Sequence, residues 1–324
     1  MMPHPRRRWP STLLALVLVL VGGPLLVPQP DAGSGPGPEL AGPDSRFSRL
    51  LGLDVHHEVA GPTDAPAVLL LHHFYGNTRT WRHVLPRLGE DDWRAIAFDR
   101  PGFGLTERPR RSAWQQGNPY TRAASARIAL GLLDVHGAEQ AVLVGASAGG
   151  TTALEAYAAA PQRVRALVLI SPAITGDVGP HPALRPVLRT PQARRLGPYL
   201  VRRRATDVTL ERITRSWHDP SRAGDDDLAA YQRPLSVDGW DRGLWEVLTA
   251  EGPPALADLL RRIDMPTLVV VGEHDGVISP RLNARTARAI PDARFEVLPD
   301  CGHTPHEECP QALLEVVEEF LAGV

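Results

Sequence analysis

Short continuous runs of apolar residues alternate along the chain with segments in which apolar residues recur at helical spacing. The apolar runs are 68–72, 95–98, 141–144, 166–170, 267–271 and 295–298. Continuous runs of this length are typical of strands buried on both faces of a parallel sheet. Helices are expected at 80–88, 121–136, 148–160, 280–290 and 310–321. This alternation predicts an α/β fold with a mostly parallel, doubly wound sheet.

The alternation stops between residues 173 and 262, where Pro, Arg, Trp and Asp are frequent and the helical fragments are amphipathic. The stretch contains large aromatic residues that can form a hydrophobic core of its own: Trp217, Tyr231, Trp240 and Trp245. We therefore expect 173–262 to be a helical cap, or lid, inserted into a core made of 46–172 and 263–324.

The first 45 residues form a separate region. The basic residues Arg6, Arg7 and Arg8 precede an apolar stretch at 13–27, an order that is typical of an export signal. The stretch is shorter than the ~20 residues that cross a bilayer comfortably. No clear small-x-small cleavage site follows it, so membrane association through residues 11–27 stays open. The body of the chain is expected to be extracytoplasmic, either secreted or tethered, with 28–43 as a flexible tether.

Composition narrows the function classes further. The net charge is −2 and all 35 basic residues are arginine, which gives no reason to expect a nucleic-acid partner. The two cysteines, Cys301 and Cys309, either form a disulfide or stay as free thiols, because spacing alone does not fix their geometry. The sequence predicts no oligomeric state.

The strongest chemical signal is the segment Gly145-Ala146-Ser147-Ala148-Gly149, which joins an apolar run to an Ala-rich helix. A serine at such a junction can sit on a strained turn that exposes its hydroxyl. A serine hydroxyl needs a base, and the base needs a third group to orient it. Asp275 and His303 each follow an expected strand, and the order serine, acid, histidine suits a hydrolytic triad.

Other residues compete for the acid and base roles. Glu273 and Asp300 are alternative acids. His274 and His306 are alternative bases. His306 is expected to be a supporting or surface residue.

Four separated motifs over about 46–324 resemble the α/β-hydrolase superfamily. They are the serine elbow at Ser147, Gly-Glu-His-Asp ending at Asp275, Gly-His-x-Pro-His-Glu-Glu with His303, and a loop from Asp99 to Gly104. That loop, and the sequence at 231–235, look like those of dehalogenase-like and epoxide-hydrolase-like members with a helical cap. The resemblance implies the α/β-hydrolase fold, with no cofactor and no metal. Some members of the superfamily carry the acid after the preceding strand, which makes the region near Asp177 a further alternative to Asp275.

The resemblance also implies an oxyanion hole built from two backbone N–H groups. Ala148 and Phe74 are expected to supply them. Relatives usually have His-Gly where this chain has His72-His73. If the family backbone needs a positive φ at that position, His73 would be strained.

A serine nucleophile separates this chain from dehalogenases and epoxide hydrolases, which attack with a carboxylate. The leading hypothesis is hydrolysis of a small-molecule carboxylic ester through an acyl-enzyme. Three alternatives stay open: hydrolysis of a carbon–carbon bond in a meta-cleavage product, perhydrolysis as in haloperoxidase-like members, and a non-catalytic binding module.

Overall fold

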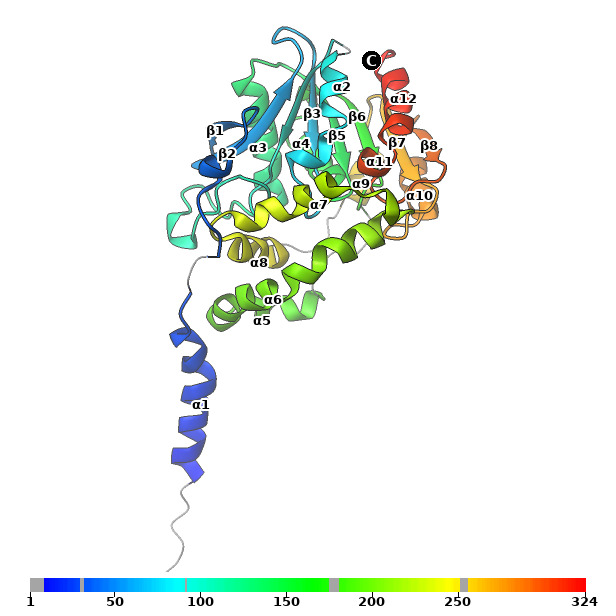
Figure 1. Cartoon of the computed structure of the whole chain (residues 1–324). Coiled ribbons are helices and arrows are strands. Elements are labelled where there is room, and N and C mark those ends of the chain that lie inside the picture. The colour runs from blue at the N-terminus through cyan, green and yellow to red at the C-terminus, as the bar shows by residue number, and fades with distance from the viewer. Residues whose placement is uncertain (1–8, 30–31, 91, 175–180, 251–255) are drawn as a thin grey trace, which may run out of the picture.

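The computed structural model describes residues 9–29, 32–90, 92–174, 181–250 and 256–324, and its centre is an eight-stranded sheet (Figure 1). The strand order is β1-β2-β4-β3-β5-β6-β7-β8. The strands are β1 (Arg46–Leu50), β2 (Leu53–Ala60), β3 (Ala67–Leu71), β4 (Arg94–Phe98), β5 (Ala141–Ala146), β6 (Val164–Ile170), β7 (Thr267–Gly272) and β8 (Arg294–Leu298). From β4 to β8 in this order every pairing is parallel, whereas β1 and β2 pair antiparallel. The predicted α/β fold class is confirmed.

Side chains on the two faces of the sheet pack into two separate hydrophobic cores. On β3, Leu69 and Leu71 belong to one core, while Val68 and Leu70 belong to the other. The first core is covered by α3 (Arg122–Val135), α4 (Ala148–Ala159) and α10 (Pro280–Ala289). The second is covered by α2 (Leu85–Glu90) and α12 (Pro310–Leu321). The central strands are buried on both faces, which explains their continuous apolar runs.

One expected helix is interrupted. The pattern at 80–88 predicts a single helix, but the chain forms a short 3₁₀ turn, Thr78–Trp81, followed by α2 from Leu85. Pro86 lies at the second position of α2. Proline lacks an N–H and fits only the first turn of a helix, so α2 starts just before it.

Among the described residues between β6 and β7, where the strand–helix alternation stops, the chain forms five α-helices. They are α5 (Arg185–Leu188), α6 (Pro191–Ser216), α7 (Asp225–Gln232), α8 (Trp240–Ala250) and α9 (Ala257–Leu260). We call α5 to α8 the inserted helices. In Figure 1 they lie together below the sheet, on the side where its parallel strands end.

The N-terminal apolar stretch forms α1 (Trp9–Leu26). Its C-terminal end contacts α6, where Gln192 Nε2 donates to the Val21 carbonyl oxygen at 3.1 Å. In Figure 1 the rest of α1 extends away from the other elements. Within the part of the chain that the structure describes, no helix combines the length and apolarity needed to cross a membrane. The arginines of the expected export signal, Arg6 to Arg8, lie outside the described residues.

The following segment differs from the flexible tether that its composition predicts. Gly35 forms a bridge with Val237, and the Asp238 N–H donates to the Gly35 carbonyl oxygen at 2.9 Å. Gly37 packs so closely on Leu105 that an added Cβ would lie 1.9 Å from the Leu105 carbonyl oxygen. Backbone hydrogen bonds and close packing therefore hold residues that proline and glycine content alone marks as mobile.

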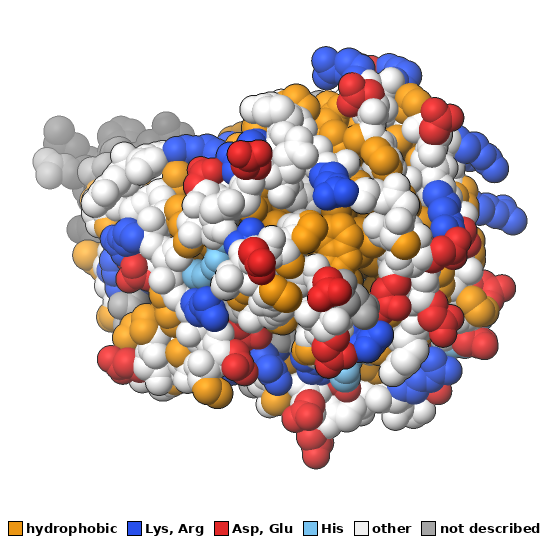
Figure 2. Space-filling view, turned by 90° about the horizontal axis from the view of Figure 1, so that it is seen from above, with side chains coloured by type: hydrophobic (Ala, Val, Ile, Leu, Met, Phe, Trp, Pro, Cys, Tyr) orange, Lys and Arg blue, Asp and Glu red, His pale blue; other side chains and the backbone are white. Residues whose placement is uncertain are grey.

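Charges of both signs are interspersed on the face seen in Figure 2, which looks onto the top of the molecule in Figure 1. Apolar side chains lie between them.

Candidate active site

Ser147 occupies the turn between β5 and α4. Its φ of 49° and ψ of −112° are unfavourable for a residue with a side chain. The turn is held on both sides, because the Ser147 N–H donates to Ile170 on β6 at 2.8 Å and its carbonyl oxygen accepts from Gly150 at 3.0 Å. Strain that is fixed in this way is common at functional sites. The Ser147 hydroxyl makes no hydrogen bond to any described residue.

The glycines around Ser147 allow the strand and the helix to approach closely. A Cβ added at Gly149 would lie 1.9 Å from the Leu71 carbonyl oxygen, and one at Gly145 would lie 2.6 Å from Gly149. Both contacts are with backbone atoms, which cannot rotate away. These positions therefore admit only glycine while α4 starts where it does.

Asp275 and His303 are brought together, as the sequence predicts. His303 Nδ1 lies 2.8 Å from Asp275 Oδ2, and both residues are buried. The other oxygen, Oδ1, accepts the N–H groups of Val277 at 2.9 Å and Ile278 at 2.8 Å. Three hydrogen bonds thus hold the pair in place, and Nε2 of His303 is left for a third group.

The alternative acids and bases lie elsewhere. Glu273, His274 and Asp300 are exposed on the surface. His306 is buried rather than on the surface, with its ring 4.5 Å from that of Trp81. Asp177 lies outside the described residues. Among the described candidates, Asp275 is the acid that contacts His303.

Phe74 and Ala148 are expected to supply the two N–H groups of the oxyanion hole. Neither N–H group has a hydrogen-bond acceptor among the described residues. Ala148 is the first residue of α4, where the helix dipole also favours negative charge. The expected strain at His73 is absent, since the positive φ in this loop is at Tyr75, with 69°.

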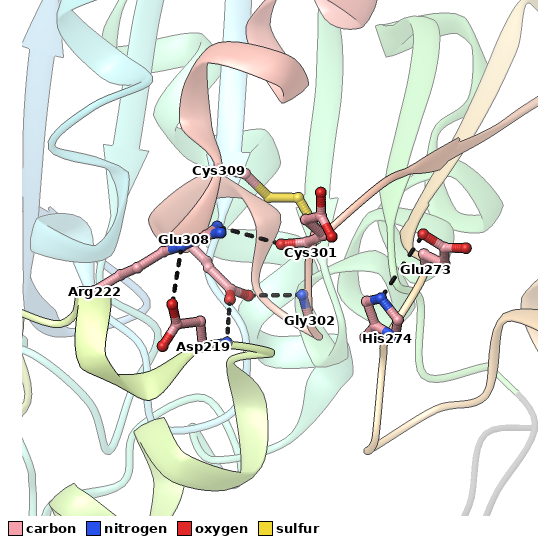
Figure 3. Close-up of a disulfide and its surroundings, with 9 residues drawn as sticks. Asp219, Arg222, Glu273, His274, Cys301, Gly302, Glu308 and Cys309 are labelled. Atoms are coloured by element: carbon pink, nitrogen blue, oxygen red, sulfur yellow. Dashed lines mark hydrogen bonds and ion pairs between the residues drawn. A yellow bond between two sulfur atoms is a disulfide. The ribbon is translucent and has the colours of Figure 1, made fainter.

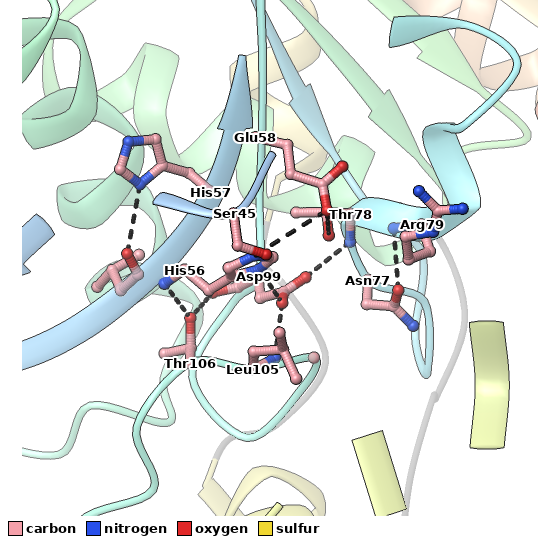
Figure 4. A network of polar contacts seen from close by, with 12 residues as sticks. Ser45, His56, His57, Glu58, Asn77, Thr78, Arg79, Asp99, Leu105 and Thr106 are labelled. Carbon is pink, nitrogen blue, oxygen red and sulfur yellow. Dashed lines mark hydrogen bonds and ion pairs between the residues drawn. The ribbon is translucent and has the colours of Figure 1, made fainter. Parts of the chain in front are cut away.

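Asp99 joins the loop that follows β3 to the loop that follows β4 (Figure 4). Its carboxylate accepts from the N–H of Thr78, the N–H of Leu105 and the ring of His56, each at 2.7 Å. Burial alone would raise the pKa of Asp99, but His56 and these hydrogen bonds hold it below the ordinary value. The aspartate of the motif at 99–104 therefore supports the site without facing it.

A disulfide and a carboxylate brace the loop that carries His303 (Figure 3). Cys301 and Cys309 are joined, with their Cα atoms 6.2 Å apart. Glu308 accepts the N–H of Gly302 at 2.6 Å and that of Asp219, beyond α6, at 2.8 Å. The loop is thus tied both to itself and to the segment that follows α6.

A buried polar cluster lies next to this loop, and local sequence patterns did not predict it. The Tyr231 hydroxyl, on α7, lies 2.6 Å from Glu307 Oε2 and 3.1 Å from His73 Nε2. Glu307 belongs to α11 (Pro305–Glu308), just after His303. Tyr231 therefore links the inserted helices to two loops. One is the loop at 72–77, which we call the oxyanion loop after the role expected for Phe74, and the other is the loop that carries His303.

Burial shifts the proton equilibria of this cluster. It raises the pKa of Glu307 to about 7, although Tyr231 and Arg82 act in the opposite direction. It lowers the pKa of His306 to about 3 and holds that of His73 well below its ordinary value. Both imidazoles are consequently neutral near neutral pH.

Two groups of described residues have side chains close enough together to hold a metal ion. His73, His306 and Glu307 form the buried group. The guanidinium of Arg82 lies 3.7 Å from Glu307, and its charge opposes a cation there. The exposed group comprises His218, His274 and Asp300.

Comparison with known proteins shows the family to which this chain belongs. The family model described as alpha/beta hydrolase fold matches residues 66–310. The chain belongs to the α/β-hydrolase family. A 2-hydroxymuconate semialdehyde hydrolase of Pseudomonas putida is 32% identical over 71% of this chain and 77% of its own length. An uncharacterized hydrolase of Bacillus subtilis is 24% identical over 87% of this chain and 99% of its own.

Solved structures of other α/β-hydrolases are also similar. A thermophilic esterase from Thermogutta terrifontis superposes with a TM-score of 0.69 and 26% identity, over 86% of this chain and 96% of that one. In this α/β-hydrolase a cavity of about 830 Å³ lies between the core and the inserted helices. Its lining is mostly apolar and includes Tyr75, Phe103, Leu188, Leu200, Tyr231 and Trp245. A cavity of this size accommodates a small-molecule substrate.

Proposed function

We propose that the protein is a serine hydrolase that cleaves carboxylic esters of small to medium apolar compounds. The main support is the contact of 2.8 Å between His303 and Asp275 at the same edge of the sheet as the strained Ser147. Open α/β sheets bind substrates at the carboxyl ends of their strands.

The proposed reaction has two halves. His303 Nε2 takes the Ser147 proton while Oγ attacks the ester carbonyl, and Asp275 stabilises the imidazolium that forms. The N–H groups of Phe74 and Ala148 hold the negative oxygen of the tetrahedral intermediate. His303 then protonates the leaving alcohol, and water repeats the sequence on the acyl-enzyme to release the acid and restore Ser147.

Ser147, Asp275 and His303 are not among the residues that line this cavity. The cavity adjoins the expected oxyanion hole instead, because Tyr75 and Phe103 line it and both rings pack against Phe74. Its lining favours an apolar ester over a charged one. Arg108 lines the cavity, but its Nη atoms already donate to the carbonyl oxygens of Gly104 at 2.7 Å and Thr106 at 3.1 Å. Arg204 also lines the cavity and is exposed to solvent. The remaining lining is chiefly leucine and aromatic side chains, which suit an apolar acyl or alcohol group.

The test is hydrolysis of p-nitrophenyl esters of graded acyl length by wild type and by Ser147→Ala. We expect the variant to lose at least about 10³-fold in kcat, as loss of a triad nucleophile does. Ser171→Ala is a matched control, because Ser171 also has a positive φ, 43°, at the next strand end. Ser171 is fully buried, so no substrate reaches it. Equal turnover in wild type and Ser147→Ala would contradict the proposal.

A second candidate reaction is hydrolysis of a carbon–carbon bond in a vinylogous diketone. The relative named 2-hydroxymuconate semialdehyde hydrolase favours it. Following the loss of absorbance of a meta-cleavage product separates the two reactions. Turnover of that compound faster than of any p-nitrophenyl ester would replace the ester proposal.

We further propose that the protein is exported. The basic-then-apolar order at 6–27 and the disulfide between Cys301 and Cys309 support this, since disulfides persist in oxidising compartments. Residues 1–45 fused to an alkaline phosphatase that is active only outside the cytoplasm should give activity. An inactive but intact fusion would argue against export.

A further inference from the structure

Three exposed side chains from three different segments meet beside the candidate active site: His218, His274 and Asp300. His218 follows α6, His274 directly precedes Asp275, and Asp300 follows β8. The two imidazole rings are stacked, with their centroids 3.8 Å apart and their planes 16° apart. One possible ligand atom from each residue lies within 4.8 Å of the others.

Backbone contacts fix the positions of these three segments. The His274 N–H donates to the Cys301 carbonyl oxygen at 2.9 Å, and the His303 N–H donates to the Ser216 carbonyl oxygen at 2.5 Å. A Cβ added at Gly302 would lie 2.6 Å from the backbone nitrogen of His218, so these two segments of the backbone are in direct contact. The three side chains are therefore carried by a braced frame, and only their own torsions need to change.

At least one imidazole must turn out of the stack to bind an ion, because a ring nitrogen coordinates in the plane of its own ring and the two planes are nearly parallel. Zinc bonds of about 2.1 Å to nitrogen and oxygen place tetrahedral ligands about 3.4 Å apart. Exposed side chains can close the remaining distance by rotation. Glu273 can supply a further oxygen, since its Oε2 lies 3.8 Å from His274 Nε2. The neighbouring Arg222 donates to the Asp300 carbonyl oxygen at 3.3 Å and pairs with Asp219, away from the carboxylate of Asp300.

We propose that His218, His274 and Asp300 form a binding site for a divalent transition-metal ion, best suited to Zn²⁺. Two imidazoles and a carboxylate are a ligand set for zinc, copper or nickel rather than for calcium or magnesium. The open fourth position takes Glu273 or water.

The ion bridges parts of the molecule that must move relative to each other if the inserted helices open. His218 belongs to the segment after α6, while His274 and Asp300 belong to the loops that carry Asp275 and His303. Because the ion binds the folded arrangement of these segments, it raises thermal stability.

The experiment uses the full chain with any affinity tag removed and metal stripped by EDTA. Zn²⁺ is titrated by isothermal calorimetry, and the melting temperature is followed in parallel. We expect one Zn²⁺ per chain with micromolar affinity and a rise in melting temperature. Ser147→Ala should bind equally well, which keeps this result independent of the proposed hydrolase activity.

Three substitutions locate the site. His218→Asn and His274→Asn should each weaken binding by about tenfold or more and remove the rise in melting temperature. His181→Asn is the matched control, an exposed histidine outside the group, and should bind like wild type. The proposal is overturned by affinity weaker than about 1 mM, or by stoichiometric binding that survives both substitutions. Circular dichroism checks that each variant is folded.

Discussion

Replacing Glu307 by glutamine should make the protein more sensitive to acid. Burial raises the pKa of Glu307 from 4.5 to about 7. Burial lowers the pKa of His72 and of His306 from 6.5 to about 3. These three groups lie in or next to one buried cluster. Glu307 and the two histidines change the stability of the fold in opposite directions when the pH falls.

The direction follows from which state binds more protons. Between about pH 4.5 and 7, folded Glu307 holds a proton that the unfolded chain has lost, so acidification stabilises the fold. Below about pH 6.5 the unfolded chain protonates His72 and His306 while the folded chain does not, so acidification destabilises it. From about pH 6.5 to 5.5 each histidine costs about 1 kcal/mol and Glu307 offsets about 1 kcal/mol. His73, whose pKa is also lowered, adds to the loss.

Glu307→Gln keeps an acceptor for the Tyr231 hydroxyl and removes the titrating proton. The drop in unfolding free energy over this pH range should grow by about 1 kcal/mol relative to wild type. Urea unfolding followed by tryptophan fluorescence measures it at about pH 5.5, 6.0 and 6.5. Glu315→Gln, an exposed position on α12, should leave the dependence unchanged. The same slope in wild type and Glu307→Gln would refute the reasoning.

Three other substitutions test the site. Asp275→Asn should lower kcat by about 10³- to 10⁴-fold, because the amide no longer holds His303 in the right tautomer; a loss below tenfold in ester assays would exclude Asp275 as the acid. Replacing Cys301 and Cys309 by serine should cost about 2.5 kcal/mol of unfolding free energy, as expected for a sequence separation of 8, and reductant should then leave the melting temperature unchanged. Tyr231→Phe should cost about 1–3 kcal/mol in urea unfolding, because it leaves buried polar atoms without a partner; a wild-type midpoint would show that the hydroxyl contributes nothing.

The parallel part of the sheet could be predicted because burial on both faces leaves a continuous apolar run. The two strands that pair antiparallel, β1 at the edge of the sheet and β2 next to it, carry no such signal. β1 contains Arg46 and Arg49, and β2 contains His56 and His57. His56 is buried because Asp99 binds its ring at 2.7 Å, a contact between positions too far apart in sequence for a local pattern to indicate.

The candidate residues Ser147, Asp275 and His303 could be selected from the sequence for a related reason. Each follows a strand, and parallel strands end at one edge of a sheet, so local patterns predict all three residues at that edge. The structure brings two of them, Asp275 and His303, into contact at 2.8 Å. Tyr231 lies on a helix of the inserted segment instead. Its position relative to His73 and Glu307 depends on how α7 packs on the core, which no periodicity records.

His73 shows how a local rule fails when its assumption about the backbone is wrong. A glycine in the related motif suggests a left-handed position, where histidine would be strained. Here the left-handed residue is Tyr75, with a φ of 69°, and His73 lies outside that region. Its ring can therefore leave the loop without backbone cost and reach Tyr231 at 3.1 Å. The imidazole of His73, which a glycine would not provide, connects the oxyanion loop to the inserted helices. Substitution at position 73 therefore removes a contact of the loop with α7 and leaves the backbone conformation of the loop unchanged.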